Sequence, residues 1–435
     1  MGLFLARQTD IGMSAGVSRV REPEWKHSTR VGESSVRPAT LSVQSQWGTL
    51  DLIAEIADEW RQLCDEGPCR APFFRPEWIS AAIDAFANPQ RFLLVTVRDG
   101  ARLRAVLPLI EVKGRSGALM GTRLRSASLI PRFELIHGDS PEDCIPLIWQ
   151  HLRNLSGWDV IELVNVPASG AADHLLDSAC QEHFPVCRYE YARSPYISLK
   201  RQSSSPDFSR FGLSSRFRYH LRQGWRELNK IGAVRLRREE KVNAEALENF
   251  YRLEQSGWKG KKGTAIACSP SMRQFYDSVT RSAEGLGYLS MYFLDLNDKP
   301  IAAHLAFSYA GHYYPVKVAY DEAFSIYGPG HLLIAQVLQD CVERGFCEFD
   351  CLGDWTEAKA KWTEQVRPHS YGAIFRKTTI GQLRRAGTSW AHQLDAELRR
   401  VLSPVVHSAR SYLAKRRRRY SKRAEQRDSQ QDSNK

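Results

Sequence analysis

Several features that mark other protein classes are missing from this chain of 435 residues. No apolar run approaches the roughly 20 residues of a membrane-spanning helix, and Leu3-Phe4-Leu5-Ala6 is too short for a signal-peptide core. The nine cysteines form no Cys-x-x-Cys pair, and the sequence has no metal-ligand spacing, Ser/His/Asp order or Walker-type loop. We therefore expect a cytoplasmic protein that holds no metal and uses neither serine-hydrolase nor P-loop chemistry.

The positive charge is concentrated at the C-terminal end of the chain. The formal net charge is +12 at pH 7, and residues 376–435 contain 16 Lys and Arg against 5 Asp and Glu. The other 375 residues carry a net charge of only +1. The basic composition therefore gives no support for nucleic-acid binding by the body of the protein. The basic segment 376–427 is a candidate contact for an anionic membrane surface or RNA, and a peripheral position at the inner face of the membrane is one possibility.

Hydrophobic periodicity divides the chain into four parts. We expect a disordered segment at 1–40, an N-terminal lobe at 41–200, a C-terminal lobe at 201–377 and a basic helical or disordered tail at 378–435. Helical patterns occur near 50–63, 146–155, 215–230, 243–256, 270–284 and 330–338, and another begins near Pro76. Strand patterns occur at 92–97, 103–112, 158–163, 289–296, 301–309, 312–320 and 347–351.

The two lobes repeat one order of elements. Gly157–Leu163 precedes Gly345–Cys351 by 188 positions, with glycine on glycine and an acid on an acid. Hairpin turns at Asp99-Gly100 and Asn297-Asp298 lie at a similar offset. The two matches, in the same order, favour two lobes of related fold.

The segment from Ala319 to Trp362 carries the strongest indication of function. A strand ending at Asp321 leads into Tyr327-Gly328-Pro329-Gly330 and then into a helix, and a second strand follows at 347–351. A helix N-terminus beside the ends of two strands suits an anionic ligand such as the phosphates of coenzyme A. An ordinary tight turn at the start of a helix is the alternative interpretation.

Four motifs resemble a known family. They are Glu254–Gly260 with Gly263–Ile266, the hairpin Leu294–Ala303, Ala319–Asp321 leading into Tyr327–Gly330, and Phe349-Asp350 through Gly353-Asp354 to Lys359 and Trp362. Together they resemble GNAT-superfamily acetyltransferases of the CelD type, which are associated with cellulose and exopolysaccharide biosynthesis and are related to the FemAB aminoacyltransferases. The likeness spans about residues 45–377. Where the usual GNAT pyrophosphate loop reads Gln/Arg-x-x-Gly-x-Gly/Ala, this chain has Ile326–Gly330, and Pro329 has no amide hydrogen to donate.

The resemblance implies an α/β (α+β) fold of two tandem GNAT-like lobes, each a mixed, mostly antiparallel sheet flanked by helices. It implies an acyltransferase, most simply an N-acetyltransferase, that uses acetyl-CoA or another acyl-CoA as co-substrate. The acceptor would be an amine or hydroxyl of a small molecule or glycan precursor in polysaccharide or cell-envelope biosynthesis. Two alternatives remain: a FemAB-like aminoacyltransferase using aminoacyl-tRNA, and a non-catalytic scaffold that docks on a membrane through the basic tail.

Each candidate site residue has a structural alternative. The candidates for catalysis are Lys359, Asp321, Asp354 and Glu254. Those for cofactor binding are Tyr327, Gly328, Gly330, His331 and Leu332, and those for substrate binding are Trp258, Lys259, His304, Tyr320 and Trp362. Lys359 would hold a phosphate or polarise the acyl carbonyl, or be a solvated loop lysine. The aspartates would act as general bases, bind a substrate ammonium or cap loops. Glu254, Trp258 and Lys259 would form a wall for the acceptor, or Trp258 would simply pack, and His304 would border the acyl channel or pack in the core. The tyrosines would protonate a leaving thiolate or bridge core and water.

Overall fold

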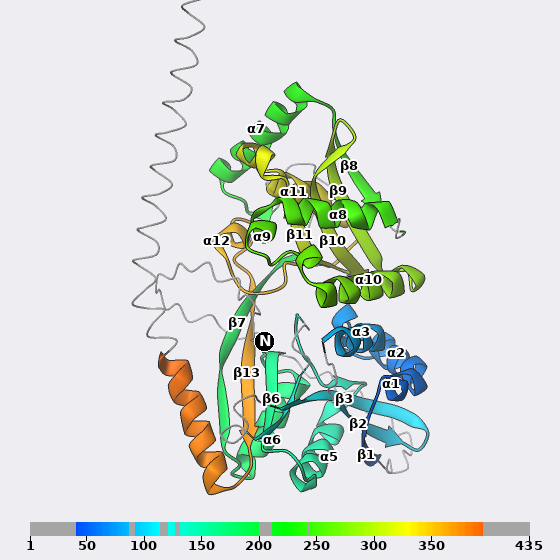
Figure 1. Cartoon of the computed structure of the whole chain (residues 1–435), viewed down its shortest axis with the longest axis vertical. Coiled ribbons are helices and arrows are strands. Elements are labelled where there is room, and N and C mark those ends of the chain that lie inside the picture. Colours follow the sequence, from blue (N-terminus) through cyan, green and yellow to red (C-terminus); the bar gives the residue numbers. More distant parts are fainter. Residues whose placement is uncertain are drawn as a thin grey trace, which may run out of the picture. The chain divides into compact units, whose positions relative to one another are not determined.

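The computed structural model describes residues 41–86, 92–113, 121–126, 131–199, 211–239, 241 and 244–394. Residues 1–40, for which we predict disorder, lie outside the described residues, and so does the tail beyond residue 394. One compact unit contains the described residues as far as Arg385, and residues 386–394 belong to a second unit. Both lobes lie in the first unit (Figure 1).

The first lobe contains a sheet whose strands follow the order β1-β2-β3-β4-β6, in which β4 and β6 are parallel. These strands are β1 (Leu41–Gly48), β2 (Phe92–Asp99), β3 (Arg102–Lys113), β4 (Thr122–Arg125) and β6 (Val160–Pro167), and the short β5 (Ile136–His137) pairs with β3. Its helices are α1 (Asp51–Glu55), α2 (Ala57–Glu66), η1 (Pro72–Phe74), α3 (Pro76–Phe86), α5 (Pro141–Asn154) and α6 (Ala171–Gln181).

The second lobe repeats this plan with the strand order β12-β11-β10-β9-β8, in which β11 and β12 are parallel. Its strands are β8 (Val234–Glu239), β9 (Leu289–Leu296), β10 (Lys299–Tyr309), β11 (His312–Tyr320) and β12 (Glu348–Asp350). Its helices are α7 (Ser215–Ile231), α8 (Ala244–Ser256), α9 (Trp258–Lys261), η3 (Ile266–Cys268), α10 (Pro270–Gly285), η4 (Glu322–Tyr327), α11 (Pro329–Glu343) and α12 (Glu357–Ala360).

Two long strands join the lobes into one sheet. β7 (Val186–Ser198) pairs through its first part with β13 (Val366–Phe375) and through its last three residues with β12. β13 also pairs with β6, so a strand from the C-terminal part of the chain lies inside the first lobe's sheet (Figure 1). β13 falls within the predicted C-terminal lobe 201–377, and its backbone hydrogen bonds go to β6 and β7.

Alternating side chains of the second lobe's strands enter two different cores. Met291 and Phe293 of β9 pack in the core that includes residues of α8 and α10. Tyr292 and Leu294 pack in the core that includes residues of α7 and α11. The sheet is therefore covered on both faces, with α8 and α10 on one and α11 on the other (Figure 1).

The predicted fold class is confirmed: a large mixed sheet is flanked by helices, and the two lobes repeat one plan. Both predicted hairpins form, and residues Gly100, Asn297 and Asp298 have the positive φ values that such turns need. The aligned segment 157–163 includes the first half of β6, and the segment 345–351 includes β12. Each of these strands is the second member of its lobe's parallel pair, β4 with β6 and β11 with β12.

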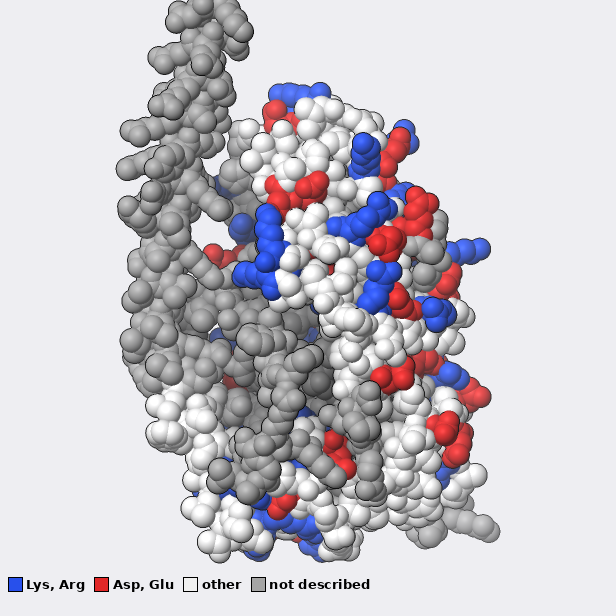
Figure 2. Space-filling model, in the orientation of Figure 1, with Lys and Arg blue, Asp and Glu red and all other residues white. Residues whose placement is uncertain are grey.

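The surface and the segment after β13 add two observations. Lys and Arg are interspersed with Asp and Glu over the face shown in Figure 2, in agreement with the nearly neutral body. Residues 379–394 are helical and expose four apolar side chains, Ile380, Leu383, Trp390 and Leu394. No helix among the described residues is long and apolar enough to cross a bilayer.

The position of β13 predicts the effect of a proline. Ala373 is fully buried and pairs with Glu162 of β6 and Cys187 of β7. We expect Ala373→Pro to lower the free energy of unfolding, measured by urea denaturation, by about 3 kcal/mol or more, because proline removes a ladder hydrogen bond between two strands. Ala391→Pro, at an exposed position of the helix 379–394, is the comparison variant and should lower that free energy by less, because it disturbs that helix and no strand pairing. Equal values for the two variants would contradict the placement of β13.

Candidate functional site

The parallel strands β11 and β12 stay together for only two residue pairs. His312 pairs with Glu348 and Tyr313 with Phe349, and β11 then continues to Tyr320 while β12 ends at Asp350. The other edge of β12 pairs with β7, which directs β12 away from β11. Beyond Tyr313, β11 therefore has an edge that no strand among the described residues pairs with, which we call the open edge of β11.

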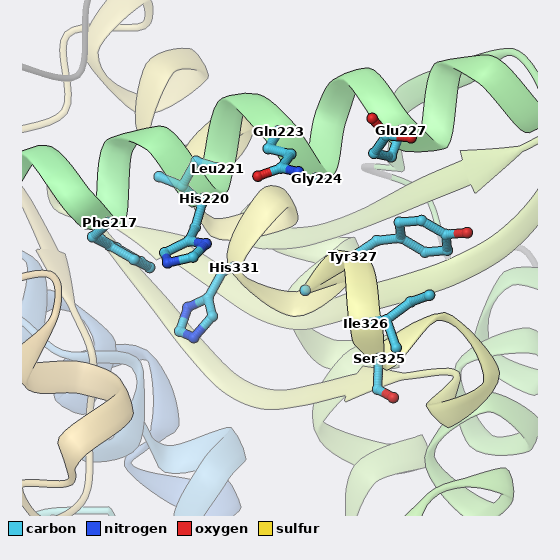
Figure 3. Close-up of a pocket in the computed structure, with 11 residues that line it drawn as sticks. Phe217, His220, Leu221, Gln223, Gly224, Glu227, Ser325, Ile326, Tyr327 and His331 are labelled. Carbon is cyan, nitrogen blue, oxygen red and sulfur yellow. The ribbon is translucent and has the colours of Figure 1, made fainter. Parts of the chain in front are cut away.

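A pocket of about 440 Å³ lies between α7 and the start of α11 (Figure 3). Its lining comes from α7 (Phe217, His220, Leu221, Gln223, Gly224, Glu227) and from the segment before and within α11 (Ser325, Ile326, Tyr327, Gly328, His331). Gly224 is required for this close approach, because a Cβ there would lie 2.3 Å from the carbonyl oxygen of Tyr327. The side chains of Phe217 and His220 point towards His331 (Figure 3).

The start of α11 offers few free amides. Gly328 has a φ of 67°, a left-handed conformation that favours glycine, and its carbonyl accepts hydrogen bonds from the amides of His331 and Leu332 at 2.9 and 3.0 Å. Pro329 has no amide hydrogen. Of the first four helix residues, Gly330 is thus the one whose amide remains to bind a ligand at this helix terminus.

His331 lines the pocket and contacts two aromatic rings. The indole nitrogen of Trp362 donates a hydrogen bond to Nδ1 of His331 at 3.1 Å, and Phe217 packs edge-on against both rings. Burial, with a smaller effect from Lys361, lowers the pKa of His331 to about 4. The imidazole is therefore neutral at pH 7, with its proton on Nε2.

The structure places Lys359 against backbone rather than in the pocket. Its Nζ donates to the carbonyl oxygens of Leu352 at 2.5 Å and Asp354 at 2.9 Å. Leu352 and Gly353 both have positive φ values, so the ammonium bonds to the two ends of a strained turn. Burial lowers the pKa of Lys359, and the nearby Cys351, Asp354 and Asp350 oppose this effect.

The two candidate aspartates accept hydrogen bonds from loop amides. Oδ1 of Asp321 accepts from the amide of Ala323 and caps η4. Oδ1 of Asp354 accepts from the amides of Arg193 and Trp355, at 2.9 and 2.8 Å. Both positions agree with the interpretation that these aspartates cap loops. These hydrogen bonds use only one oxygen, Oδ1, of each carboxylate.

The acceptor-side candidates lie near the last part of β11. Glu254 is buried, and its two oxygens accept hydrogen bonds from Lys259 and from the amide of Ile266. Lys259 also donates to the carbonyl oxygen of Val318 in β11. Trp258 begins α9, and the end of α8 approaches Tyr320, since a Cβ on Gly257 would lie 3.6 Å from the carbonyl oxygen of Tyr320.

His304 is a core residue with one free nitrogen. It is fully buried in β10, and its Nδ1 lies 3.2 Å from the hydroxyl of Tyr313. Its Nε2 has no hydrogen-bond partner among the described residues, and burial lowers the pKa of His304 to about 3. The histidine is thus neutral, and its full burial agrees with the alternative that it packs in the core.

The predicted residues therefore form two groups rather than one. Tyr327, Gly328 and His331 line the pocket, with Trp362 bonded to His331. Glu254 and Lys259 lie on the α8 side of β11. The α7 side chains of the pocket were not predicted, although Gly224 inside a strongly amphipathic helical pattern is the kind of signal that indicates a close contact.

A network of charged side chains that was not predicted from the sequence connects the lobes. Arg132 donates to Asp350 at 2.5 Å, and Arg367 pairs with Glu348. Nearby, Nδ1 of His369 lies 2.7 Å from Oδ1 of Asn165. Because these partners are far apart in sequence, no local pattern could have revealed the network. In the part of the chain that the structure describes, no three His, Cys, Asp or Glu side chains are arranged to hold a metal.

Comparison with known proteins identifies the fold of the second lobe. Residues 215–360, from α7 through α12, match the family model described as acetyltransferase (GNAT) domain. The crystal structure of FemX has a TM-score of 0.54 at 10% identity, covering 77% of this chain and 98% of that one. Residues 215–360 of the second lobe are therefore similar to a GNAT acetyltransferase domain, and FemX supports the fold of the two lobes together.

Two other solved structures are similar at lower scores. A tandem GNAT protein from the clavulanic acid biosynthesis pathway has a TM-score of 0.41 at 13% identity, covering 77% of this chain and 98% of that one. The L-PGS of Bacillus licheniformis has a TM-score of 0.40 at 12% identity, covering 65% and 85%. No curated protein matches the sequence.

The contacts of Lys359 predict a structural effect that can be separated from catalysis. We expect Lys359→Met to lower the free energy of unfolding by roughly 1–3 kcal/mol, because two carbonyl groups lose a charged donor. Lys361→Met is the matched control, since its ammonium lies over the ring of Phe217 at 5.8 Å. Urea denaturation of both variants gives the comparison. An unchanged value for Lys359→Met would show that this ammonium does not stabilise the turn.

Proposed function

We propose that this chain is an acyltransferase that moves an acyl group, most simply acetyl, from an acyl-CoA to an amine or hydroxyl of an acceptor. The observation that carries the proposal is the separation of β11 from β12 beside the start of α11. It lies inside the segment that matches the GNAT model. Acyl transfer needs hydrogen-bond donors for the oxyanion, and the open edge of β11 supplies backbone amides for that purpose.

The donor would occupy the pocket between α7 and α11. His220, Gln223 and Ser325 line this pocket with side chains that can donate hydrogen bonds, and the amide of Gly330 lies at the helix terminus. A thioester bound there would reach the open edge of β11 at its acyl end. His331 would contact the donor as a neutral imidazole held by Trp362.

The acceptor would approach from the opposite face, where α8 and α9 meet the last part of β11. The proposed acceptor is a polysaccharide or cell-envelope precursor, and the resemblance to the CelD type supports that choice. Lys359 would act indirectly, through the turn at 352–354 that follows β12. This proposal makes Lys359 a positioning residue rather than a group that touches the acyl carbonyl.

A second candidate is aminoacyl transfer from charged tRNA, as in the FemAB-like enzymes. The start of α11 favours it, because Pro329 and the bonded amides of His331 and Leu332 leave only Gly330 among the first four helix residues to bind pyrophosphate. A donor whose phosphates bind elsewhere would not need more amides. Binding of aminoacyl-tRNA that weakens steeply with salt, together with no binding of acetyl-CoA, would select this candidate.

The donor pocket gives a direct test of the first candidate. We expect Gln223→Glu to weaken acetyl-CoA binding at least about tenfold, because it places a carboxylate where phosphates would bind. Asn229→Asp adds the same charge at an exposed position of α7 outside the pocket and should bind as the unaltered chain does. Isothermal titration calorimetry measures both.

Release of coenzyme A, followed with a thiol reagent over a panel of amino and hydroxyl sugars, tests the reaction itself. Binding of acetyl-CoA that is equally strong in the Gln223→Glu and Asn229→Asp variants would place the donor elsewhere. No binding to the unaltered chain would reject acyl-CoA as the donor.

A further inference from the structure

A buried carboxylate on the α8 face of β11, that of Glu254, pairs with one lysine and lies near a second. The side chain of Glu254 is 1% exposed, and its Oε1 accepts a hydrogen bond from Lys259 at 2.7 Å. Its Oε2 accepts from the amide of Ile266 at 2.8 Å. Lys259 donates in addition to the carbonyl oxygen of Val318 at 3.1 Å. Both carboxylate oxygens and the Lys259 ammonium are therefore engaged by the protein.

The second lysine, Lys317, lacks such partners. It lies in β11 opposite Leu305, so its side chain shares the face that α8 and α10 cover. Its Nζ lies 5.4 Å from the ring centre of Tyr276 in α10. Among the residues that the structure describes, its ammonium has no hydrogen-bond or ion-pair partner. The residue as a whole is partly exposed.

The charges of this group do not balance. Lys259 and Lys317 contribute two positive charges and Glu254 one negative charge, which leaves a net charge of +1 in a largely buried place. Burial lowers the pKa of Lys317, and the nearby Glu254 opposes this effect. A partly desolvated cation without a counter-ion is unfavourable, and an anion bound beside it would remove that cost.

The position of Lys317 connects it to the proposed reaction. It follows Tyr313, the last residue of β11 that pairs with β12, by four residues. At the rise of an extended strand, this is about 13 Å along β11. The donor pocket lies by α7 and α11, whereas Lys317 faces α8 and α10. A molecule bound at Lys317 would thus approach the open edge of β11 from the face opposite the donor.

We propose that Lys317 binds a phosphate group of the acyl acceptor, with Lys259 held in place beside it by Glu254. This inference rests on the proposed acyl transfer and narrows the acceptor to a phosphorylated molecule. The phosphate would take the hydrogen bonds that the Lys317 ammonium does not make within the protein. A soluble sugar phosphate and a lipid-linked phosphate offer the same chemistry.

Calorimetry on the full chain with N-acetylglucosamine 1-phosphate, and with unphosphorylated N-acetylglucosamine, tests the proposal. We expect the phosphorylated sugar to bind at least about tenfold more tightly than the neutral one. Lys317→Met should abolish this preference and Lys317→Arg should retain it. Lys299→Met, which removes an exposed lysine at the start of β10 in the same sheet, should retain it fully.

A second arm identifies the source of the phosphate. Sedimentation with phosphatidic acid vesicles, compared with phosphatidylcholine vesicles, reports a lipid phosphate. Binding of the sugar phosphate or of phosphatidic acid vesicles that depends on Lys317 supports the proposal. The ligand that shows this dependence identifies the source of the phosphate. Binding that is unaffected by Lys317→Met in both arms, or no preference for phosphate in either, overturns it.

Two controls separate this inference from its basis. Phosphate binding lost in Gln223→Glu but kept in Lys317→Met would assign the phosphate to the donor pocket and overturn the proposal. We expect acetyl-CoA to bind the Lys317→Met variant as it binds the unaltered chain. If the unaltered chain does not bind acetyl-CoA, that result rejects acetyl-CoA as the donor and does not bear on Lys317. The melting temperature of Lys317→Met should not fall, because an apolar side chain of similar length replaces an unpaired cation.

Discussion

The site depends on the pairing of β12, a strand of three residues held by different neighbours on its two edges. On one side it shares two residue pairs with β11, and on the other it shares three with β7. β7 in turn pairs along most of its length with β13, which is anchored by β6. β12 therefore follows β7 and leaves β11. The opening in the second lobe's sheet is a consequence of how the two lobes are joined.

This dependence gives the first lobe a physical role. β6 and β7 bind β13, and the Arg132 side chain from the first lobe meets the buried Asp350 at the end of β12. A common apolar core also spans the lobes, with Trp78 of α3 packed on Phe275 and Phe307 of the second lobe. The first lobe thus fixes the geometry of the opening, whether or not it binds a ligand of its own.

Local patterns were sufficient to predict the elements but not the way the sheet is joined. The hairpins at Asp99-Gly100 and Asn297-Asp298 were predictable because their turn residues adopt positive φ values. β13 was missed because Pro368 and Gly372 interrupt its strand pattern, and its partners lie more than 160 residues earlier. The helix following Gly328 was predicted, and so was the missing amide donor at Pro329.

The candidate site was also predicted only in part, because local sequence patterns do not show long-range contacts. Tyr327, Gly328 and His331 follow from a local strand-loop-helix pattern and do line the pocket. The hydrogen bonds of Lys359 to two carbonyl groups depend on the conformation of the turn, which sequence alone does not specify. Lys317 had a visible signal, a lone charge within the apolar strand 312–320, whose meaning required the positions of Glu254 and Tyr276.

Hydrogen–deuterium exchange of the full chain with and without acetyl-CoA tests the central claim most directly. The account predicts slower exchange in α7 between residues 217 and 227, in the segment 325–333, and along β11 beyond Tyr313. It predicts no change in the corresponding elements of the first lobe, β4 and α5. No protection at these places under saturating acetyl-CoA, or protection confined to the first lobe, would contradict the claim that the opening beside β11 is the site of acyl transfer.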